Sequence, residues 1–259
     1  MLGCAALVFG AIYVATRPTT TGPLVRGAKP PAPPPAQPIT AEANRTVAVA
    51  PPSAEGASNL DAITASRQKD DEATVLAGKA NTLITSGDPK GAVHLLEEAV
   101  RLSPEDETLR YNLGIAYSRS GDVTNAEYQY REALRLLPDY PEVHNNLGNL
   151  LLHARRMSEA ETQFTEAIRL MPELASAHNN LGLVRRNQNR MPEAIACFRK
   201  AVQYNTNYWQ AHYNLALASL LQGATNEGRA ELQTVLRLNP GYAPAQNALD
   251  WPSAQPSRP

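Results

Sequence analysis

The sequence predicts an all-α fold, a solenoid of about five stacked helix pairs, and two repeating patterns lead to this prediction. The pentapeptide HNNLG occurs twice, from His144 to Gly148 and from His178 to Gly182, at a separation of 34 residues. Proline recurs at the same interval, with Thr206 in the one step that lacks it: Pro104, Pro138, Pro172 and Pro240. Recurrence at a fixed interval of this size is typical of proteins that stack copies of one supersecondary unit.

Small and large apolar residues recur in register with the prolines and give the bounds of the copies. Counted from residue 73, positions 8, 20 and 27 of each copy are small, and position 24 is large. The small series are Ala80, Gly114, Gly148, Gly182, Ala216; Ala92, Ala126, Ala160, Ala194, Gly228; and Ala99, Ala133, Ala167, Ala201, Val235. The large series is Leu96, Tyr130, Phe164, Phe198, Leu232. We therefore predict five repeats, at residues 73–106, 107–140, 141–174, 175–208 and 209–242.

Within one repeat the apolar residues follow a helical spacing twice, so each repeat is predicted to be a helix pair. One stripe contains Val143, Leu147, Leu150 and Leu151, and a second contains Ala160, Phe164, Ala167 and Ile168. The prolines end each second helix because proline lacks an N–H and its ring clashes with the preceding turn.

The turn inside each helix pair is predicted from residues that tolerate a positive φ. Gly87, Gly121 and Gly223 occupy this place in three repeats, and Asn189 can serve in the fourth. Arg155 stands there in repeat three, where a non-glycine residue costs up to about 1 kcal/mol.

At these residues the chain resembles the tetratricopeptide repeat family, which has a 34-residue repeat with this pattern of small, aromatic and proline positions. The resemblance covers roughly two thirds of the chain. It implies a right-handed superhelix of helix pairs with a concave groove. Residues 243–251 are predicted to form a helix that caps repeat five, followed by a disordered tail at 252–259.

The N-terminal segment, residues 1–16, is predicted to be a single-pass membrane anchor. Its core, LGCAALVFGAIYVA, is apolar and uncharged. As a helix, sixteen residues span about 24 Å, a little less than the hydrocarbon core of a bilayer, so a cleaved signal peptide and a start that lacks upstream residues both stay open. Positive charges follow the segment, at Arg17, Arg26 and Lys29, and favour a cytoplasmic body. Long domains are translocated regardless of such charges, and the side of the membrane stays open, with a lean towards an exported, periplasmic-type body.

Residues 17–58 are predicted to be a disordered, partly polyproline linker, because prolines are frequent there and few apolar residues could pack. Residues 59–72 form a possible lead-in helix to repeat one.

The composition argues against several classes of function. The chain has 259 residues with 24 lysines and arginines against 25 aspartates and glutamates, a net charge of −1, which leaves no positive excess for nucleic acid. Its two cysteines form neither a disulfide framework nor a metal motif, and no HExxH or GxSxG pattern occurs. We therefore expect no enzyme activity and no cofactor.

Two polar series remain as candidates for function. The histidines His144, His178 and His212 stand at position 4, where packing explains them better than a metal, because helices about 8–10 Å apart place them too far from one another to share a zinc ion. Arginines gather near the predicted ends of first helices, where helix C-termini favour them and an acidic partner site is the alternative: Arg119, Arg155, Arg156, Arg185, Arg186 and Arg190.

Asparagine occupies position 6 of four repeats, at Asn112, Asn146, Asn180 and Asn214. A carboxamide offers both a donor and an acceptor, which suits the backbone of an extended peptide, and one asparagine about every 10 Å would meet every third ligand residue. Similar asparagines in the repeat domain of O-linked N-acetylglucosamine transferases hold substrate backbones, although asparagine at this position can also simply solvate a helix. Neighbouring residues predicted to add contacts are Tyr111, Asn145, Asn149, Asn179 and Tyr213.

These patterns predict a membrane-tethered, non-enzymatic scaffold whose groove binds extended segments of other proteins. Two alternatives stay open. The chain could recruit substrates for a repeat-linked enzyme such as a glycosyltransferase, or it could associate with itself as a structural protein, and its oligomeric state does not follow from the sequence.

Overall fold

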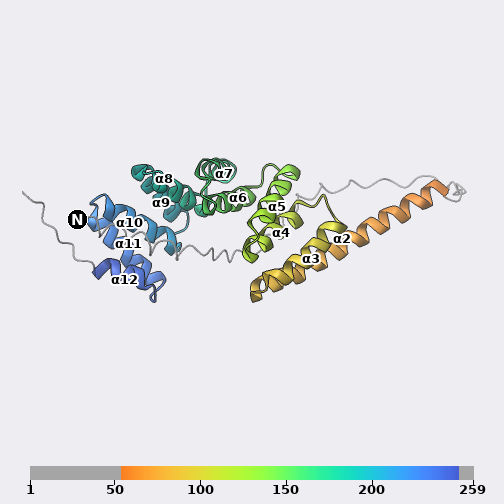
Figure 1. Cartoon of the computed structure of the whole chain (residues 1–259), viewed down its shortest axis with the longest axis horizontal. Helices are drawn as coiled ribbons and strands as arrows, with labels where there is room; N and C mark the ends of the chain where they lie inside the picture. Colours follow the sequence, from red (N-terminus) through yellow and green to blue (C-terminus); the bar gives the residue numbers. More distant parts are fainter. Residues whose placement is uncertain (1–53, 251–259) are drawn as a thin grey trace, which may run out of the picture. The chain divides into compact units, whose positions relative to one another are not determined.

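The computed structural model describes residues 54–250, with side chains from residue 63 onward. The predicted anchor, most of the predicted linker and the predicted tail lie outside these residues. From residue 57 onward the described part of the chain belongs to one compact unit. It contains eleven helices and no strand within residues 54–250, which confirms the predicted all-α fold (Figure 1).

The helices alternate along the chain between first and second members of a pair. The first helices are α2 (Ala54–Ser86), α4 (Glu107–Ser120), α6 (Pro141–His153), α8 (Ala175–Asn187) and α10 (Trp209–Leu221). The second helices are α3 (Pro89–Leu102), α5 (Val123–Leu136), α7 (Met157–Leu170), α9 (Met191–Tyr204) and α11 (Thr225–Leu238), and α12 (Ala243–Asp250) follows. From α3 onward each helix packs against the next in the chain, and first helices also contact one another from α6 to α10.

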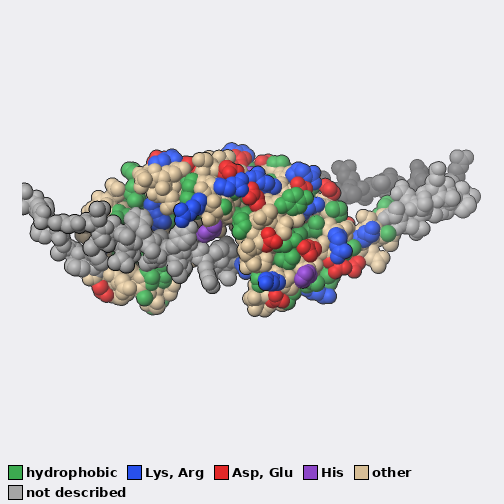
Figure 2. Space-filling model, viewed as in Figure 1, with side chains coloured by type: hydrophobic (Ala, Val, Ile, Leu, Met, Phe, Trp, Pro, Cys, Tyr) green, Lys and Arg blue, Asp and Glu red, His purple; other side chains and the backbone are tan. Residues whose placement is uncertain are grey.

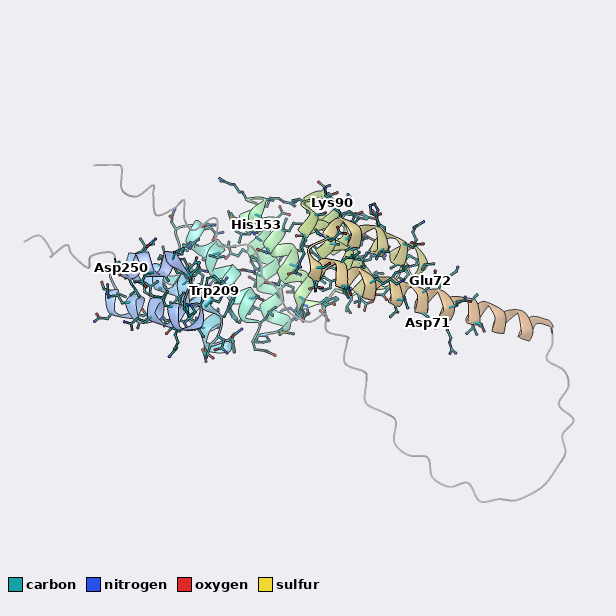
Figure 3. The ribbon with its side chains drawn as sticks, turned by 90° about the horizontal axis from the view of Figure 1, so that it is seen from below. Asp71, Glu72, Lys90, His153, Trp209 and Asp250 are labelled. Atoms are coloured by element: carbon teal, nitrogen blue, oxygen red, sulfur yellow. The ribbon has the colours of Figure 1, made fainter. Side chains whose placement is uncertain are left out.

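Helix α2 is longer than the sequence suggested. It begins at Ala54, inside the range predicted as linker, and continues without a break through the possible lead-in helix and the first helix of repeat one (Figures 1 and 3). No proline interrupts these 33 residues. The extension is fixed to the end of α3 by a hydrogen bond of 2.5 Å that the Ser103 hydroxyl donates to Asp70.

The turn between the two helices of each pair has the predicted left-handed conformation. Gly87, Gly121 and Gly223 have φ values of 90°, 89° and 79°. Asn189 has φ 61° and Arg155 has φ 62°, so both non-glycine residues adopt the conformation that glycine adopts elsewhere. The strain expected at Arg155 is therefore present in the backbone.

The close approach of the paired helices depends on a match between positions 8 and 24. A Cβ atom added to Gly148 would lie 2.8 Å from the ring of Phe164, and Gly114 and Gly182 face Tyr130 and Phe198 at similarly short distances. Where position 24 is a leucine, position 8 is an alanine: Ala80 with Leu96, and Ala216 with Leu232. The space beside position 8 is thus filled by one of two complementary pairs.

Buried side chains form two hydrophobic clusters along the repeats. One lies between Ala73 and Ala116, the other between Ala126 and Ala218, and Ile115 and Tyr117 pack against both. At the C-terminal end α12 packs on α11, where Arg229 donates a 3.0 Å hydrogen bond to the carbonyl of Leu249. The continuous packing holds the first helices in fixed register with one another, which positions the polar residues they carry.

Candidate functional site

The asparagines of position 6 lie on four consecutive first helices, with the residues of position 5 beside them. We call the surface formed by positions 5, 6, 9, 12 and 13 of α4, α6, α8 and α10 the first-helix surface. Asn112 and Asn214 are only 4% and 6% exposed, whereas Asn146 and Asn180 are half-buried. Asn145, Asn179 and Tyr213 at position 5 are buried, and Tyr111 and Asn149 are half-buried.

Each of three position-6 asparagines donates a hydrogen bond to the position-5 residue of the preceding repeat. Asn146 Nδ2 donates to Tyr111 Oη at 3.0 Å. Asn180 Nδ2 donates to Asn145 Oδ1 at 3.2 Å, and Asn214 Nδ2 donates to Asn179 Oδ1 at 2.8 Å. The two residues of each pair are 35 positions apart in the sequence, so these bonds connect neighbouring repeats.

This arrangement uses the amide NH₂ groups within the protein and leaves part of the oxygens free. Within residues 63–250 no donor is hydrogen-bonded to the Oδ1 atoms of Asn146 and Asn214, and Asn180 Oδ1 accepts one hydrogen bond from Asn179 at 3.3 Å. Asn112 lacks such a bond, because the preceding repeat has Ala77, an apolar residue, at position 5. The Oδ1 atom of Asn112 is enclosed and has no hydrogen-bond partner in the described part of the chain. The site can therefore offer acceptors more readily than donors.

Tyrosines at position 34, just before a first helix, pack against the position-5 residues. The rings of Tyr111 and Tyr140 lie 5.2 Å apart, and those of Tyr213 and Tyr242 lie 5.1 Å apart and meet edge to face. Tyr208 hydrogen-bonds the Asn179 side chain, and burial raises the pKa of its phenol to about 12. These rings stay neutral at physiological pH and give the surface an aromatic component.

The histidines of position 4 join the repeats through backbone carbonyls. His144, His178 and His212 each place Nε2 2.8–3.0 Å from the carbonyl oxygen of position 32 in the preceding repeat. No group of three His, Cys, Asp or Glu side chains in the described region could hold a metal ion. The hydrogen bonds thus give this series a structural explanation, more polar than the packing that the sequence suggested.

The pKa values of two of these histidines shift in opposite directions. The hydrogen bond of His212 Nδ1 to Glu231 raises the pKa of His212, whereas burial lowers the pKa of His178.

Arg156 and Arg190 lie two residues beyond the C-caps of α6 and α8, near the helix ends as predicted, but their side chains have ion-pair partners that the sequence did not suggest. Arg156 and Arg190 occupy the N-cap residues of α7 and α9, and each forms ion pairs with a glutamate of the preceding second helix, Glu127 and Glu161, at 2.7 and 2.8 Å. Burial would raise the pKa of Glu127, but hydrogen bonds from Arg131 and Arg156 lower it overall. These pairs were not predicted from the sequence, although in both of them the arginine follows its glutamate by 29 residues.

Arg186 differs from the nearby arginines Arg185 and Arg190, which form ion pairs with glutamates. It stands in the last turn of α8 as predicted, but among the residues that the structure describes its Nη1 atom is enclosed without a hydrogen-bond partner and it belongs to no ion pair. Its neighbour Arg185, by contrast, lies near Glu161 and Glu193.

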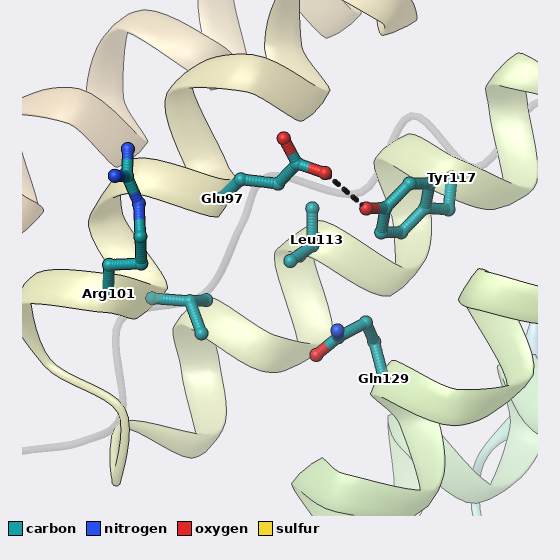
Figure 4. Close-up of a pocket in the computed structure, with 6 residues that line it drawn as sticks. Glu97, Arg101, Leu113, Tyr117 and Gln129 are labelled. Carbon is teal, nitrogen blue, oxygen red and sulfur yellow. Dashed lines mark hydrogen bonds between the residues drawn. The ribbon is translucent and has the colours of Figure 1, made fainter.

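The two described depressions lie away from the first-helix asparagines. One, of about 360 Å³, is lined by residues of α3, α4 and α5, where the Tyr117 hydroxyl donates a 2.5 Å hydrogen bond to Glu97 (Figure 4). The other lies along α7. Where Figure 2 shows the described side chains, acidic and basic ones are intermingled over the repeats, and this visible part of the face has no extended basic patch for a polyanion.

These observations identify the class of protein. The chain stacks helix pairs, and polar side chains join each pair to its neighbours, so it is a helical-repeat protein. The sequence profile of the tetratricopeptide repeat matches residues 77–141, 111–175, 145–208 and 179–243. The chain belongs to the tetratricopeptide repeat family and is a protein-interaction scaffold.

Several solved structures share the fold. PilF of Pseudomonas aeruginosa is 21% identical, with a TM-score of 0.64 over 69% of this chain and 81% of that one. MamA of Desulfovibrio magneticus RS-1 is 22% identical, with a TM-score of 0.57 over 66% and 97%. YrrB, described as a repeat protein with an unusual peptide-binding site, is 19% identical, with a TM-score of 0.54 over 72% and 96%.

No curated protein matches the chain. Among the described residues no helix is long and apolar enough to cross a membrane.

Proposed function

We propose that the protein is a membrane-tethered scaffold that holds extended segments of partner proteins on its first-helix surface. The apolar segment at 1–16 would anchor the chain and residues 17–53 would tether the repeats to it. The observation that carries the proposal is the series of carboxamides fixed in register by hydrogen bonds of 2.8–3.2 Å between repeats.

The fixed carboxamides favour a backbone ligand. Because its NH₂ group is held by the preceding repeat, each carboxamide keeps one orientation, and the free oxygens of Asn146 and Asn214 can accept N–H groups of an extended chain. Preorganised acceptors cost little side-chain entropy when the ligand binds. Each net hydrogen bond contributes about 0.5–1.5 kcal/mol, so a few of them with aromatic contacts support modest affinity and broad sequence tolerance.

The test separates ligand binding from inter-repeat bracing. Asn146→Ala removes both the hydrogen bond to Tyr111 and the free oxygen, whereas Tyr111→Phe removes only the hydrogen bond. Peptides would be selected on the full chain from a random display library, and their dissociation constants measured for both variants. We expect Asn146→Ala to weaken binding about threefold to tenfold and Tyr111→Phe to weaken it much less. Equal losses, or no selected peptides, would refute the proposal.

The anchoring part has its own test. Full-length protein should sediment with membranes and resist extraction at alkaline pH. Recovery in the soluble fraction would contradict the tether and leave the peptide site untouched.

A further inference from the structure

The strongest unexplained feature of the first-helix surface is the environment of Arg186. Its Nη1 atom is enclosed and has no hydrogen-bond partner among the described residues. The equivalent residues of the neighbouring repeats are leucines, and Leu152 is 9% exposed. A guanidinium therefore stands where the two adjacent repeats place a leucine, and no acidic side chain in the described part of the chain forms an ion pair with it.

A second donor without a partner belongs to a ring that packs on Tyr213. The hydroxyl of Tyr242 is also enclosed without a hydrogen-bond partner. Tyr213 of α10 connects the two: its ring meets that of Tyr242 edge to face at 5.1 Å, and it interacts electrostatically with Arg186. Trp209, labelled in Figure 3, packs on Tyr242 from the start of α10 at 4.6 Å.

The chemistry of this group selects one kind of ligand. Guanidinium and phenol groups both donate hydrogen bonds, and a carboxylate accepts from both while neutralising the cation. The planar guanidinium fits the two carboxylate oxygens, and its partial removal from water strengthens the interaction. An unpartnered buried donor is costly for the folded protein, so a ligand that satisfies it gains more than at a hydrated arginine.

We propose that Arg186, Tyr213 and Tyr242 form a carboxylate-binding subsite that receives an acidic group of the extended segment bound on the first-helix surface. This inference rests on the proposed peptide-binding function and adds a specificity to it. The backbone acceptors hold an extended chain without reading its sequence, whereas the subsite favours segments with an aspartate or glutamate next to repeats four and five.

The test uses the full chain and peptides selected on it from a random display library. In the wild-type selection we expect acidic residues to be enriched at one peptide position. For the best synthetic peptide, replacing that residue by its amide should weaken binding about tenfold or more. Arg186→Met should abolish the difference between acid and amide, Arg186→Lys should reduce it, and Tyr242→Phe should reduce it to a smaller extent.

Controls separate the subsite from net charge and from folding. Arg155→Met removes an exposed arginine of the neighbouring repeat and should keep the acid preference. Thermal unfolding of each variant identifies any loss of fold. A matched pair of peptides with a free or an amidated C-terminus distinguishes a chain-end carboxylate from a side-chain carboxylate. Binding that is lost on amidation identifies the chain end as the occupant, and binding that is kept identifies the side chain.

The outcomes for this inference and for the proposed function differ. Peptides that bind the wild-type protein without acid preference, or with a preference that survives in Arg186→Met, overturn the subsite and leave peptide binding standing. A wild-type selection that yields no peptides overturns both.

Discussion

Replacement of Gly148 by alanine tests how the paired helices fit together. The added Cβ atom would lie 2.8, 2.9 and 3.1 Å from three ring atoms of Phe164, well inside the 3.5–4.0 Å of an ordinary carbon contact. Phe164 is completely buried, so its ring cannot move aside without disturbing the cluster around it. Overpacking of this kind costs about 1–3 kcal/mol, against a gain of about 1 kcal/mol in helix propensity. We expect a net destabilisation of about 1 kcal/mol.

A second substitution should restore the fit. Phe164→Leu in the Gly148→Ala background reproduces the alanine–leucine pair that repeat one forms with Ala80 and Leu96. Alone, Phe164→Leu should cost about 1–2 kcal/mol through lost burial. In combination the two changes should cost less than their sum, by about 1 kcal/mol or more, because leucine leaves room for the new methyl group.

Urea unfolding followed by circular dichroism measures all four proteins of this cycle. Gly78→Ala is the matched control, since it lies inside helix α2 and an added Cβ meets nothing within 4 Å, so propensity alone should stabilise it by about 1 kcal/mol. A Gly148→Ala protein that is stabilised as much as Gly78→Ala would refute the steric argument. Strictly additive effects in the cycle would refute the proposed pairing of positions 8 and 24.

Three further substitutions test local features. Arg155→Gly should raise stability by about 0.5–1 kcal/mol in thermal unfolding because φ is 62° there, whereas Arg155→Ala should give no gain. Because the hydrogen bond to Glu231 raises the pKa of His212 above its ordinary value of 6.5, the stability advantage of wild type over His212→Gln should be full below pH 6.5 and decline as pH rises through the folded pKa; a constant difference from pH 5 to 9 would contradict this. Arg186→Leu should raise the thermal midpoint, by about 1 kcal/mol of stability, because it removes an enclosed donor with no partner, and a lowered midpoint would show that the arginine supports the fold.

Much of the fold follows from the sequence because one packing solution is repeated at a fixed interval. The 34-residue series of small and large residues identifies the contacts between paired helices, and the residues at Gly121 and Asn189 identify the turns, since both depend on local sterics. The length of α2 was not predicted. Nothing in its sequence breaks a helix, but the periodic pattern that indicates the repeats begins only at about residue 73 and says nothing of the residues before it.

The candidate site was predicted less completely, because its geometry depends on which side chains meet across repeats. The position-6 asparagines were identified. The hydrogen bond that Asn146 donates to Tyr111 could not be predicted, because it depends on how two helices stack. A polar residue 35 positions before Asn146, Asn180 and Asn214 was the available signal. Arg186 was grouped with arginines at helix ends, and only the packing around it shows that it lacks a partner.

Site-specific photo-cross-linking tests most directly whether partners bind on the first-helix surface. A photoreactive side chain would be introduced in the full-length protein at Asn187, exposed at position 13 of α8, or at Thr162, exposed on the second helix α7. After irradiation in the producing cells, we expect cross-linked partners from position 187, reduced when Asn146→Ala is added, and few from position 162. Partners captured from position 162 alone, or captured from 187 to the same extent with and without Asn146→Ala, would contradict it.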